Sequence, residues 1–356
     1  MWLSIIIGIL VLSVIIVIHE LGHFLAAKAN DVKVEEFALG FPPKIFSFKK
    51  GETVYSLNAI PFGGYTKMLG EEDPTEPRSF ASKKPGTRLL ILSAGPLMNI
   101  LLAILLSMVM FVIPHDVVSE PVIIEEVSPG SPAALAGILP GDQVLGINDH
   151  DVKSTYDLQR MIQLNLGKEI EITLAQGDEL IKTSLVPRWD PPEGEGAIGI
   201  ELDAEAALAG RETNRIVENP LRAVPMGLSS LWETVILYKN GIVAIVTGAV
   251  PLDLMGPVGI VEVTGEVATS GGLSALFEFS GFISLIIGVM NILPLPALDG
   301  GRIAFVFIEW VRRGRKVSPR VESMVHFAGF ILLIGLMLVV TYQDIVRIIT
   351  QGGALP

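Results

Sequence analysis

The chain of 356 residues contains no cysteine, and only 18% of its residues are charged. Without cysteine there are no disulfides, no thiolate metal ligands and no cysteine nucleophile. The scarcity of charge accompanies 50% hydrophobic side chains and a mean hydropathy of +0.55, which is high for a soluble protein. Much of the apolar content lies in blocks that reach the roughly 20 helical residues needed to cross a bilayer. The sequence therefore predicts an α-helical polytopic membrane protein.

Four transmembrane spans are expected from these blocks. In chain order they cover residues 2–27, 89–113, 273–310 and 324–349. The third is broken near Pro294 and Pro296, because proline cannot continue a helix. A cleaved signal peptide ending near Ala27 is the alternative for the first block. The missing basic N-terminal region and the polar residues inside the apolar stretch argue against a signal peptide.

The charges between the spans predict the orientation of the chain. Residues 28–88 carry ten Lys and Arg, and residues 312–320 carry five basic residues and no acidic one. Both loops should face the cytoplasm by the positive-inside rule, which leaves both termini outside. The same orientation leaves residues 114–230 outside, and their 20 acidic and 8 basic residues argue against nucleic-acid binding.

Residues 226–250 are apolar enough to be ambiguous. A span here would reverse the orientation of the basic loop at residues 312–320, so an interfacial amphipathic helix is favoured. A helix partly inserted into the membrane is favoured on the same ground, and a fifth span is the alternative.

The external segment has the pattern of a small α+β domain over residues 120–203. PVIIEEV and KEIEITLA alternate as strands do, and two short helices begin after Ser131 and Ser154. Residues 127–149 resemble the core of a PDZ domain, and GAIGIEL (196–202) resembles its carboxylate-binding loop, placed last as in circularly permuted bacterial forms. Such a domain binds an extended peptide or a C-terminus. The carboxylate-binding residues would be Ala197, Ile198, Gly199 and Ile200. A structural insert that binds nothing is the alternative.

His19, Glu20 and His23 form the motif H-E-x-x-H inside the first predicted span. Residues four apart share one face of a helix, so both imidazoles can reach one zinc ion. Zinc lowers the pKa of a bound water towards about 7, and Glu20 lies close enough to address that water. A chance occurrence is the alternative. It is disfavoured because a charged group within a membrane costs about 2.5–3.5 kcal/mol.

Asp299 is the candidate third ligand. It lies in NILPLPALDGG (291–301), at the break of the third span, where irregular backbone is tolerated only if it is buried or lines a cavity. At about 1.5 Å per residue, Asp299 and His19 reach similar depths near the cytoplasmic side. His115 and His150 belong to the external segment, and His326 has no polar companion motif. An ordinary helix-end aspartate is the alternative for Asp299.

These motifs together resemble the site-2 protease family of intramembrane zinc metalloproteases. Within that family the chain is similar to the bacterial regulator of sigma-E protease group over nearly its whole length. Further matches are GPLMN (95–99), IPFGGYTKMLGE (60–71) and GPVGI (256–260). Two features depart from the pattern. Only one PDZ-like unit fits, and Pro42 stands where many members have glycine.

The resemblance implies roles for particular residues. His19, His23 and Asp299 would bind one catalytic Zn²⁺, and Glu20 would be the general base. Asn291 would hold the backbone of an unwound substrate. Asn99 would do the same or would tie the second span to its neighbours. Residues 52–69 would be a β element that dips into the membrane, and an ordinary cytoplasmic hairpin is the alternative.

The expected protein is an intramembrane zinc endopeptidase of the bacterial inner membrane, active in regulated intramembrane proteolysis. Its partners would be the bilayer, a transmembrane substrate such as an anti-sigma factor or a signal-peptide remnant, and an external peptide at the PDZ domain. A catalytically inactive PDZ-bearing scaffold and a zinc-dependent transporter are the rivals. The expected parts, in order, are two spans, the PDZ domain, the interfacial helix with a linker, and two further spans (residues 1–113, 120–203, 204–272 and 273–356).

Overall fold

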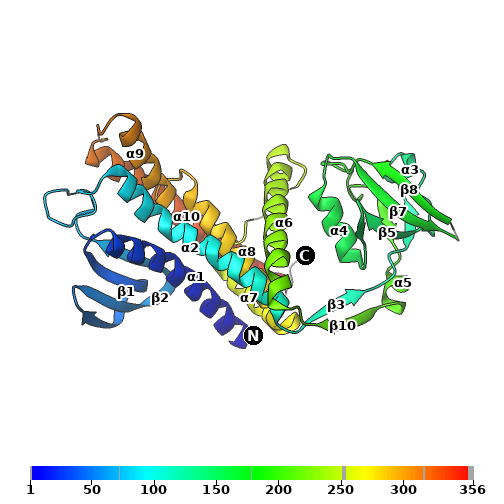
Figure 1. Cartoon of the computed structure of the whole chain (residues 1–356), viewed down its shortest axis with the longest axis horizontal. Coiled ribbons are helices and arrows are strands. Elements are labelled where there is room, and N and C mark those ends of the chain that lie inside the picture. The colour runs from blue at the N-terminus through cyan, green and yellow to red at the C-terminus, as the bar shows by residue number, and fades with distance from the viewer. Residues whose placement is uncertain (1, 72, 178, 251–253, 316, 352–356) are drawn as a thin grey trace. The chain divides into compact units, whose positions relative to one another are not determined.

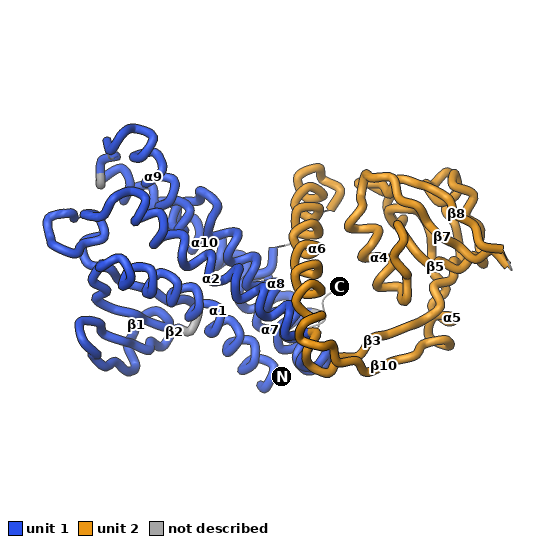
Figure 2. The backbone as a smooth tube through the Cα atoms, in the orientation of Figure 1, with its two compact units in different colours: residues 1–110, 254–356 blue, residues 111–253 orange. Residues whose placement is uncertain are grey.

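The computed structural model describes residues 2–71, 73–177, 179–250, 254–315 and 317–351. Contacts divide the chain into two compact units (Figure 2). Unit 1 comprises residues 1–110 and 254–356, and unit 2 comprises residues 111–253. Long apolar helices dominate unit 1, whereas unit 2 contains most of the strands (Figure 1). The insertion predicted from the sequence is therefore a separate structural unit.

Among the described residues, four helices are long and apolar enough to cross a membrane. They are α1 (Trp2–Ala29), α2 (Pro85–Val112), α8 (Gly272–Ile292) and α10 (Pro319–Gln351). Their positions agree with the four predicted spans, and the chain is a polytopic membrane protein. The predicted break is also present, because α8 ends before the two prolines and α9 (Asp299–Val311) begins after them.

One helix of unit 1 was not predicted. Helix α7 (Pro257–Ser270) lies within what the sequence suggested was a linker, and it packs against α1. Val261 of α7 shares a buried cluster with Leu12 and Ile15 of α1 and Ile283 of α8. With 14 residues α7 reaches about 21 Å, which is too short to span a bilayer. The sequence analysis looked for segments long enough to span a membrane, and α7 is too short to be predicted in that way.

Strands β1 (Val34–Lys50) and β2 (Thr53–Met68) fold back on themselves into a curled antiparallel sheet (Figure 1). Residues 36–39 of β1 pair with 54–57 on one side and with 64–67 on the other, and residues 44–50 pair with 53–58. The segment 52–69 is therefore one bent strand that pairs with residues 34–50, and the hairpin suggested within it is wrong. Residues 64–68 form an edge of this sheet.

Ion pairs attach the sheet to the end of α1. The carboxylate of Glu52, in the turn between the strands, accepts from Arg78 at 2.8 Å and from Lys28 at 2.5 Å. Hydrogen bonds from Arg78 and then Lys28 lower the pKa of Glu52 to about 2. Arg78 also contacts Asp31 at 2.7 Å. The sheet is thereby anchored beside the helix that carries H-E-x-x-H.

Unit 2 contains the predicted α+β domain. Its four-stranded sheet has the order β6-β5-β7-β8, and a second sheet pairs β4 with β9. The bounds are β4 Ile124–Val127, α3 Pro132–Leu135, β5 Gln143–Ile147, β6 His150–Asp151, α4 Thr155–Leu164, β7 Ile170–Gln176, β8 Glu179–Leu185 and β9 Ile200–Leu202. Ser131 and Ser154 cap α3 and α4 as predicted.

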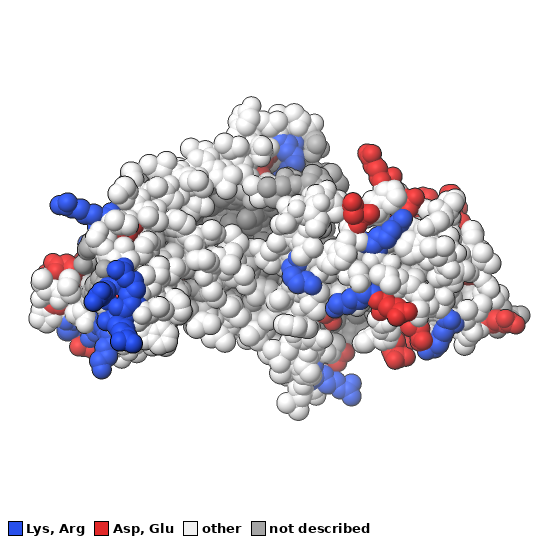
Figure 3. All heavy atoms as spheres, turned by 90° about the horizontal axis from the view of Figure 1, so that it is seen from above, with Lys and Arg blue, Asp and Glu red and all other residues white. Residues whose placement is uncertain are grey.

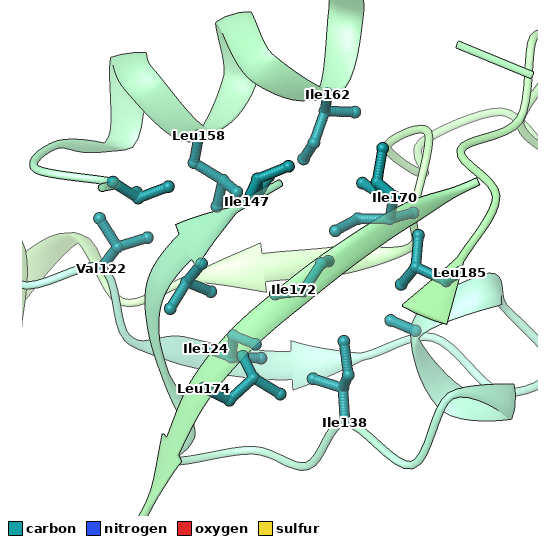
Figure 4. Close-up of a cluster of buried hydrophobic side chains, with 14 residues drawn as sticks. Val122, Ile124, Ile138, Ile147, Leu158, Ile162, Ile170, Ile172, Leu174 and Leu185 are labelled. Atoms are coloured by element: carbon teal, nitrogen blue, oxygen red, sulfur yellow. The ribbon is translucent and has the colours of Figure 1, made fainter. Parts of the chain in front are cut away.

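Buried aliphatic side chains from both sheets and from α4 form one core in this domain (Figure 4). Leu158 of α4 lies over Ile147 and Ile172 of the four-stranded sheet, and Ile124 of β4 completes the layer. These positions follow the alternation read from the sequence, in which every second residue of β7 is buried. The chain is thus a membrane protein with an inserted α+β domain.

Four further elements complete unit 2. Strands β3 (His115–Ser119) and β10 (Glu212–Ile216) pair with each other, and α5 (Ala204–Ala209) precedes β10. Helix α6 (Pro220–Thr247) packs against α4, where Asn240 donates to the carbonyl of Gln163 at 2.6 Å. Figure 3 shows many charged side chains on unit 2 and long uncharged stretches on unit 1.

Candidate metal centre and active site

His19, His23 and Asp299 converge on one point, although 280 residues separate the first from the last. The Nε2 atoms of His19 and His23 lie 3.0 and 3.2 Å from Oδ2 of Asp299, and 3.2 Å from each other. The two histidines stand one turn apart on α1, and Asp299 is the first residue of α9. In the part of the chain that the structure describes, this is the one group of three metal-ligating side chains.

The donor set fits zinc. Two imidazole nitrogens and one carboxylate oxygen are ligands that catalytic zinc accepts, with a fourth position left for water or substrate. Zinc–ligand bonds of about 2.0–2.2 Å in a tetrahedron separate the ligand atoms by about 3.3 Å. The three observed separations of 3.0–3.2 Å are close to that value. Both histidine residues are at most 9% exposed, so the two imidazoles are largely shielded from solvent.

Hydrogen bonds on the far side of each imidazole also fit a metal. Nδ1 of His23 lies 2.8 Å from the carbonyl oxygen of Ile91, so Nδ1 carries the proton and Nε2 keeps its lone pair. Nδ1 of His19 lies 3.3 Å from Nδ2 of Asn99, while Oδ1 of Asn99 is buried without a partner. Rotating this amide by 180° would let Oδ1 accept from a protonated Nδ1 of His19, which satisfies both groups. That pairing leaves Nε2 of His19 free to bind metal.

Glu20 lies beside the metal ligands. Together with His23 and Asp299 it lines a cavity of about 290 Å³ in unit 1. Its carboxylate Oε2 accepts a hydrogen bond of 2.8 Å from Thr66 Oγ1 on β2. The wall of the cavity is completed by edge residues 64–68 and by Arg302. A carboxylate that does not ligate the metal but shares a cavity with its ligands can take a proton from water there.

Helix α10 supports the break between α8 and α9. The sequence predicted the helix but not this contact. The backbone N–H of Ala297 donates to Nδ1 of His326 at 3.0 Å, and Ala297 has φ of +72°. His326 was set aside as a ligand for want of a companion motif, and the structure gives it contact with the backbone two residues before Asp299. No local pattern could have found this, because the two positions are 29 residues apart.

The residues predicted to bind substrate or a peptide carboxylate lie in three different places. Asn291 is half-buried near the end of α8, and its amide donates to the carbonyl of Ile287 at 2.9 Å. Asn99 is fully buried beneath the histidines. Residues 197–200 lie in unit 2, at one side of a groove of about 810 Å³ lined by α4 and β9. Within the described chain, the N–H groups of Ala197 and Ile198 make no hydrogen bond.

Two histidines and one aspartate at metal distance, with a non-ligating glutamate beside them, form the arrangement expected of a zinc metallopeptidase centre. Two of the three side chains lie on α1, a helix of membrane-spanning length, and the third begins α9. Comparison with known proteins agrees. The model of peptidase family M50 matches residues 7–336, and the chain belongs to that family. It is accordingly an intramembrane zinc metalloprotease, as the resemblance to site-2 proteases predicted.

Curated relatives match along almost their whole length. The chain is 39% identical to a candidate zinc metalloprotease of Clostridium acetobutylicum, covering 96% of this chain and 97% of the relative. It is 31% identical to the zinc metalloprotease RasP of Geobacillus kaustophilus, with the same two coverages. It is 29% identical to the regulator of sigma-W protease RasP of Bacillus subtilis, again over 96% and 97% of the two chains. These relatives agree with a multi-pass protein of the bacterial cytoplasmic membrane.

Proposed function

We propose that the protein hydrolyses peptide bonds within or near the transmembrane segments of other membrane proteins. In this proposal His19, His23 and Asp299 hold one zinc ion, and Glu20 is the general base. The observation that carries the assignment is the convergence of the three ligand atoms within 3.2 Å, beside a cavity that contains Glu20. Burying these groups in membrane helices is costly, and a shared metal explains why they are there.

The chemistry follows from the placement of Glu20. Zinc, when bound, supplies Lewis acidity, which polarises a carbonyl and acidifies water. The carboxylate of Glu20 takes a proton from water as the water oxygen attacks the scissile carbonyl carbon. Glu20 then returns that proton to the amide nitrogen as the C–N bond breaks. His23 and His19 are kept in the metal-binding tautomer by Ile91 and Asn99.

The edge strand at residues 64–68 is the proposed receiving surface for substrate. A membrane helix must unwind before a protease can reach its carbonyls, and the freed backbone groups then need partners. Residues 64–68 line the active-site cavity and pair on one side only, with residues 34–39. An unwound substrate can add to this edge as a further strand. Asn291, close to the break after α8, is proposed to hold further backbone groups of the substrate.

The substrate class is proposed from chemistry and from the relatives together. One relative is named for regulating sigma-W, which favours an anti-sigma factor as one substrate of this chain, as part of regulated intramembrane proteolysis. The loop charges support an orientation in which the basic loops face the cytoplasm and the PDZ domain and both chain termini lie outside.

The groove between α4 and β9 is the proposed peptide site of the PDZ domain. Unpaired N–H groups at Ala197 and Ile198 suit the carboxylate of a C-terminus, with Gly199 and Ile200 completing the loop. Leu158 and Ile162 of α4 offer an apolar wall for the last side chain of such a peptide. The occupant would be an external peptide or a newly exposed C-terminus.

Helix α6 is proposed to lie at the membrane surface. It is not one of the four helices apolar enough to span. Its small and polar residues, such as Gly227 and Asn240, are buried, whereas apolar residues including Leu228 and Trp232 are exposed. An exposed apolar stripe on a helix of this kind suits the interface between headgroups and acyl chains.

Cleavage of a membrane-spanning test peptide in detergent tests the proposal. The full chain and its Glu20→Gln variant are compared, with zinc measured on both. Removing a general base is expected to lower the rate at least about 100-fold while zinc stays bound. Equal cleavage by the two proteins would contradict the role of Glu20. Absence of cleavage and of zinc in the wild type would favour the inactive scaffold.

A further inference from the structure

Thr66 lies in the edge strand at residues 64–68 and reaches the catalytic turn of α1. Its Oγ1 is 2.8 Å from Oε2 of Glu20 and 3.1 Å from the backbone carbonyl oxygen of the same residue. The Thr66 residue is only 9% exposed. A hydroxyl has one hydrogen to donate, and the nearer, charged acceptor is the stronger one. The hydroxyl of Thr66 therefore donates to the carboxylate of Glu20.

The hydrogen bond from Thr66 restrains the orientation of the Glu20 carboxylate. Within the described residues, Glu20 accepts no side-chain hydrogen bond except from Thr66, and it has no ion pair. A glutamate has three rotatable side-chain bonds, and fixing them costs about 1.5–2 kcal/mol of rotamer entropy. One oxygen held by Thr66 leaves the other to address water in the cavity.

We infer that Thr66 is a positioning residue that aligns Glu20 for proton transfer and couples that alignment to the edge strand. The inference rests on the proposed role of Glu20 as general base. The edge strand that would receive the substrate thus also holds the carboxylate of Glu20. A substrate paired with residues 64–68 and the general base Glu20 would therefore be positioned by the same strand. Thr66 itself does not contact the reacting atoms, because its hydroxyl is engaged by Glu20.

Three variants of the full chain test this inference in the cleavage assay. Thr66→Val keeps the shape and removes the hydroxyl, and Thr66→Ser restores it. Thr53→Val is the matched control. Thr53 lies in the same strand β2 and is 1% exposed, and its hydroxyl donates to the carbonyl of Val34 at 2.8 Å, away from Glu20. Misalignment of a base by loss of its orienting bond is expected to lower kcat about tenfold.

The expected result is a kcat about tenfold lower for Thr66→Val, with KM changed less than about twofold and zinc still bound. Thr66→Ser should recover to within about threefold of the wild type, and Thr53→Val should match the wild type within about twofold. Wild-type kcat in Thr66→Val, loss of its zinc, or an equal loss in Thr53→Val would overturn the inference.

A double variant separates this inference from the role of Glu20 itself. If Thr66 acts through Glu20, Thr66→Val added to Glu20→Gln should not lower the residual rate further. An additive loss would overturn the inference and leave the role of Glu20 standing. A Glu20→Gln variant that cleaves like the wild type would instead remove the general base on which the inference rests.

Discussion

At the scale of single residues, Gly95 decides how closely α2 approaches the metal ligands. A Cβ atom at this position would lie 2.3 Å from Nε2 of His23, and real atoms do not come so close. The GPLMN match (95–99) in the second span therefore has a steric meaning. Gly95 leaves room for the imidazole, and Asn99, one turn later, supports the other histidine.

Gly95→Ala is expected to displace His23 and to weaken zinc binding about 10- to 100-fold, as changes around metal ligands typically do. The measurement is zinc retained by the purified chain after titration with a chelator. Gly86→Ala is the matched control, because the same helix α2 holds Gly86 with nothing within 4 Å of an added Cβ. Equal zinc retention by both variants would refute the steric role of Gly95.

The ligands and Glu20 could be proposed from the sequence because H-E-x-x-H and L-D-G are local patterns with costly polar groups in lipid. Thr66 and His326 could not. A threonine in a strand and a histidine at a helix start are ordinary, and their partners are 46 and 29 residues away. Contacts of that kind depend on tertiary packing, and short sequence patterns do not predict them.

At the scale of elements, α10 supports the break that carries Asp299. An added Cβ at Gly329 of α10 would lie 2.3 Å from Cβ of Pro296, and His326, one turn earlier, binds the N–H of Ala297. The last helix thus packs directly on the backbone that leads into α9. The span predicted at residues 324–349 therefore supports the backbone before Asp299, the proposed third ligand.

Gly329→Ala is expected to push this loop away from the histidines. A shift of the order of 1 Å at a catalytic site can cost about 100-fold in rate, so cleavage should fall at least about tenfold. Gly335→Ala, in the same helix with nothing within 4 Å of an added Cβ, should cleave like the wild type. The same test peptide serves for both, and undiminished cleavage by Gly329→Ala would contradict the support role of α10.

The sequence predicted those helices and strands whose formation depends mainly on one local property, such as apolar length or the alternation of apolar residues. The four long helices follow from the apolar length that a bilayer requires, and the strands and helices of the PDZ domain follow from alternation and serine caps. Helix α7 was missed because it is too short to span. The curled sheet was misread because residues 36–39 pair on both sides, and pairing partners are not visible in a strand's own pattern.

At the scale of the whole molecule, the chain combines a membrane unit that carries the proposed metal centre with an inserted unit that carries the groove proposed to bind a peptide. The acidic excess of residues 114–230, together with their strand and helix patterns, predicted this division. The proposed chemistry depends on both sequence segments of the membrane unit, since the proposed ligands come from α1 and α9, which are far apart in the sequence.

The central claim is that His19, His23 and Asp299 together bind one zinc ion. Zinc per chain, measured on the purified full-length wild type, Glu20→Gln and Asp299→Ala, tests it most directly. The account predicts about one zinc in the wild type and in Glu20→Gln, and far less in Asp299→Ala, which lacks one of three protein ligands. Asp299→Ala that retains as much zinc as the wild type would contradict it.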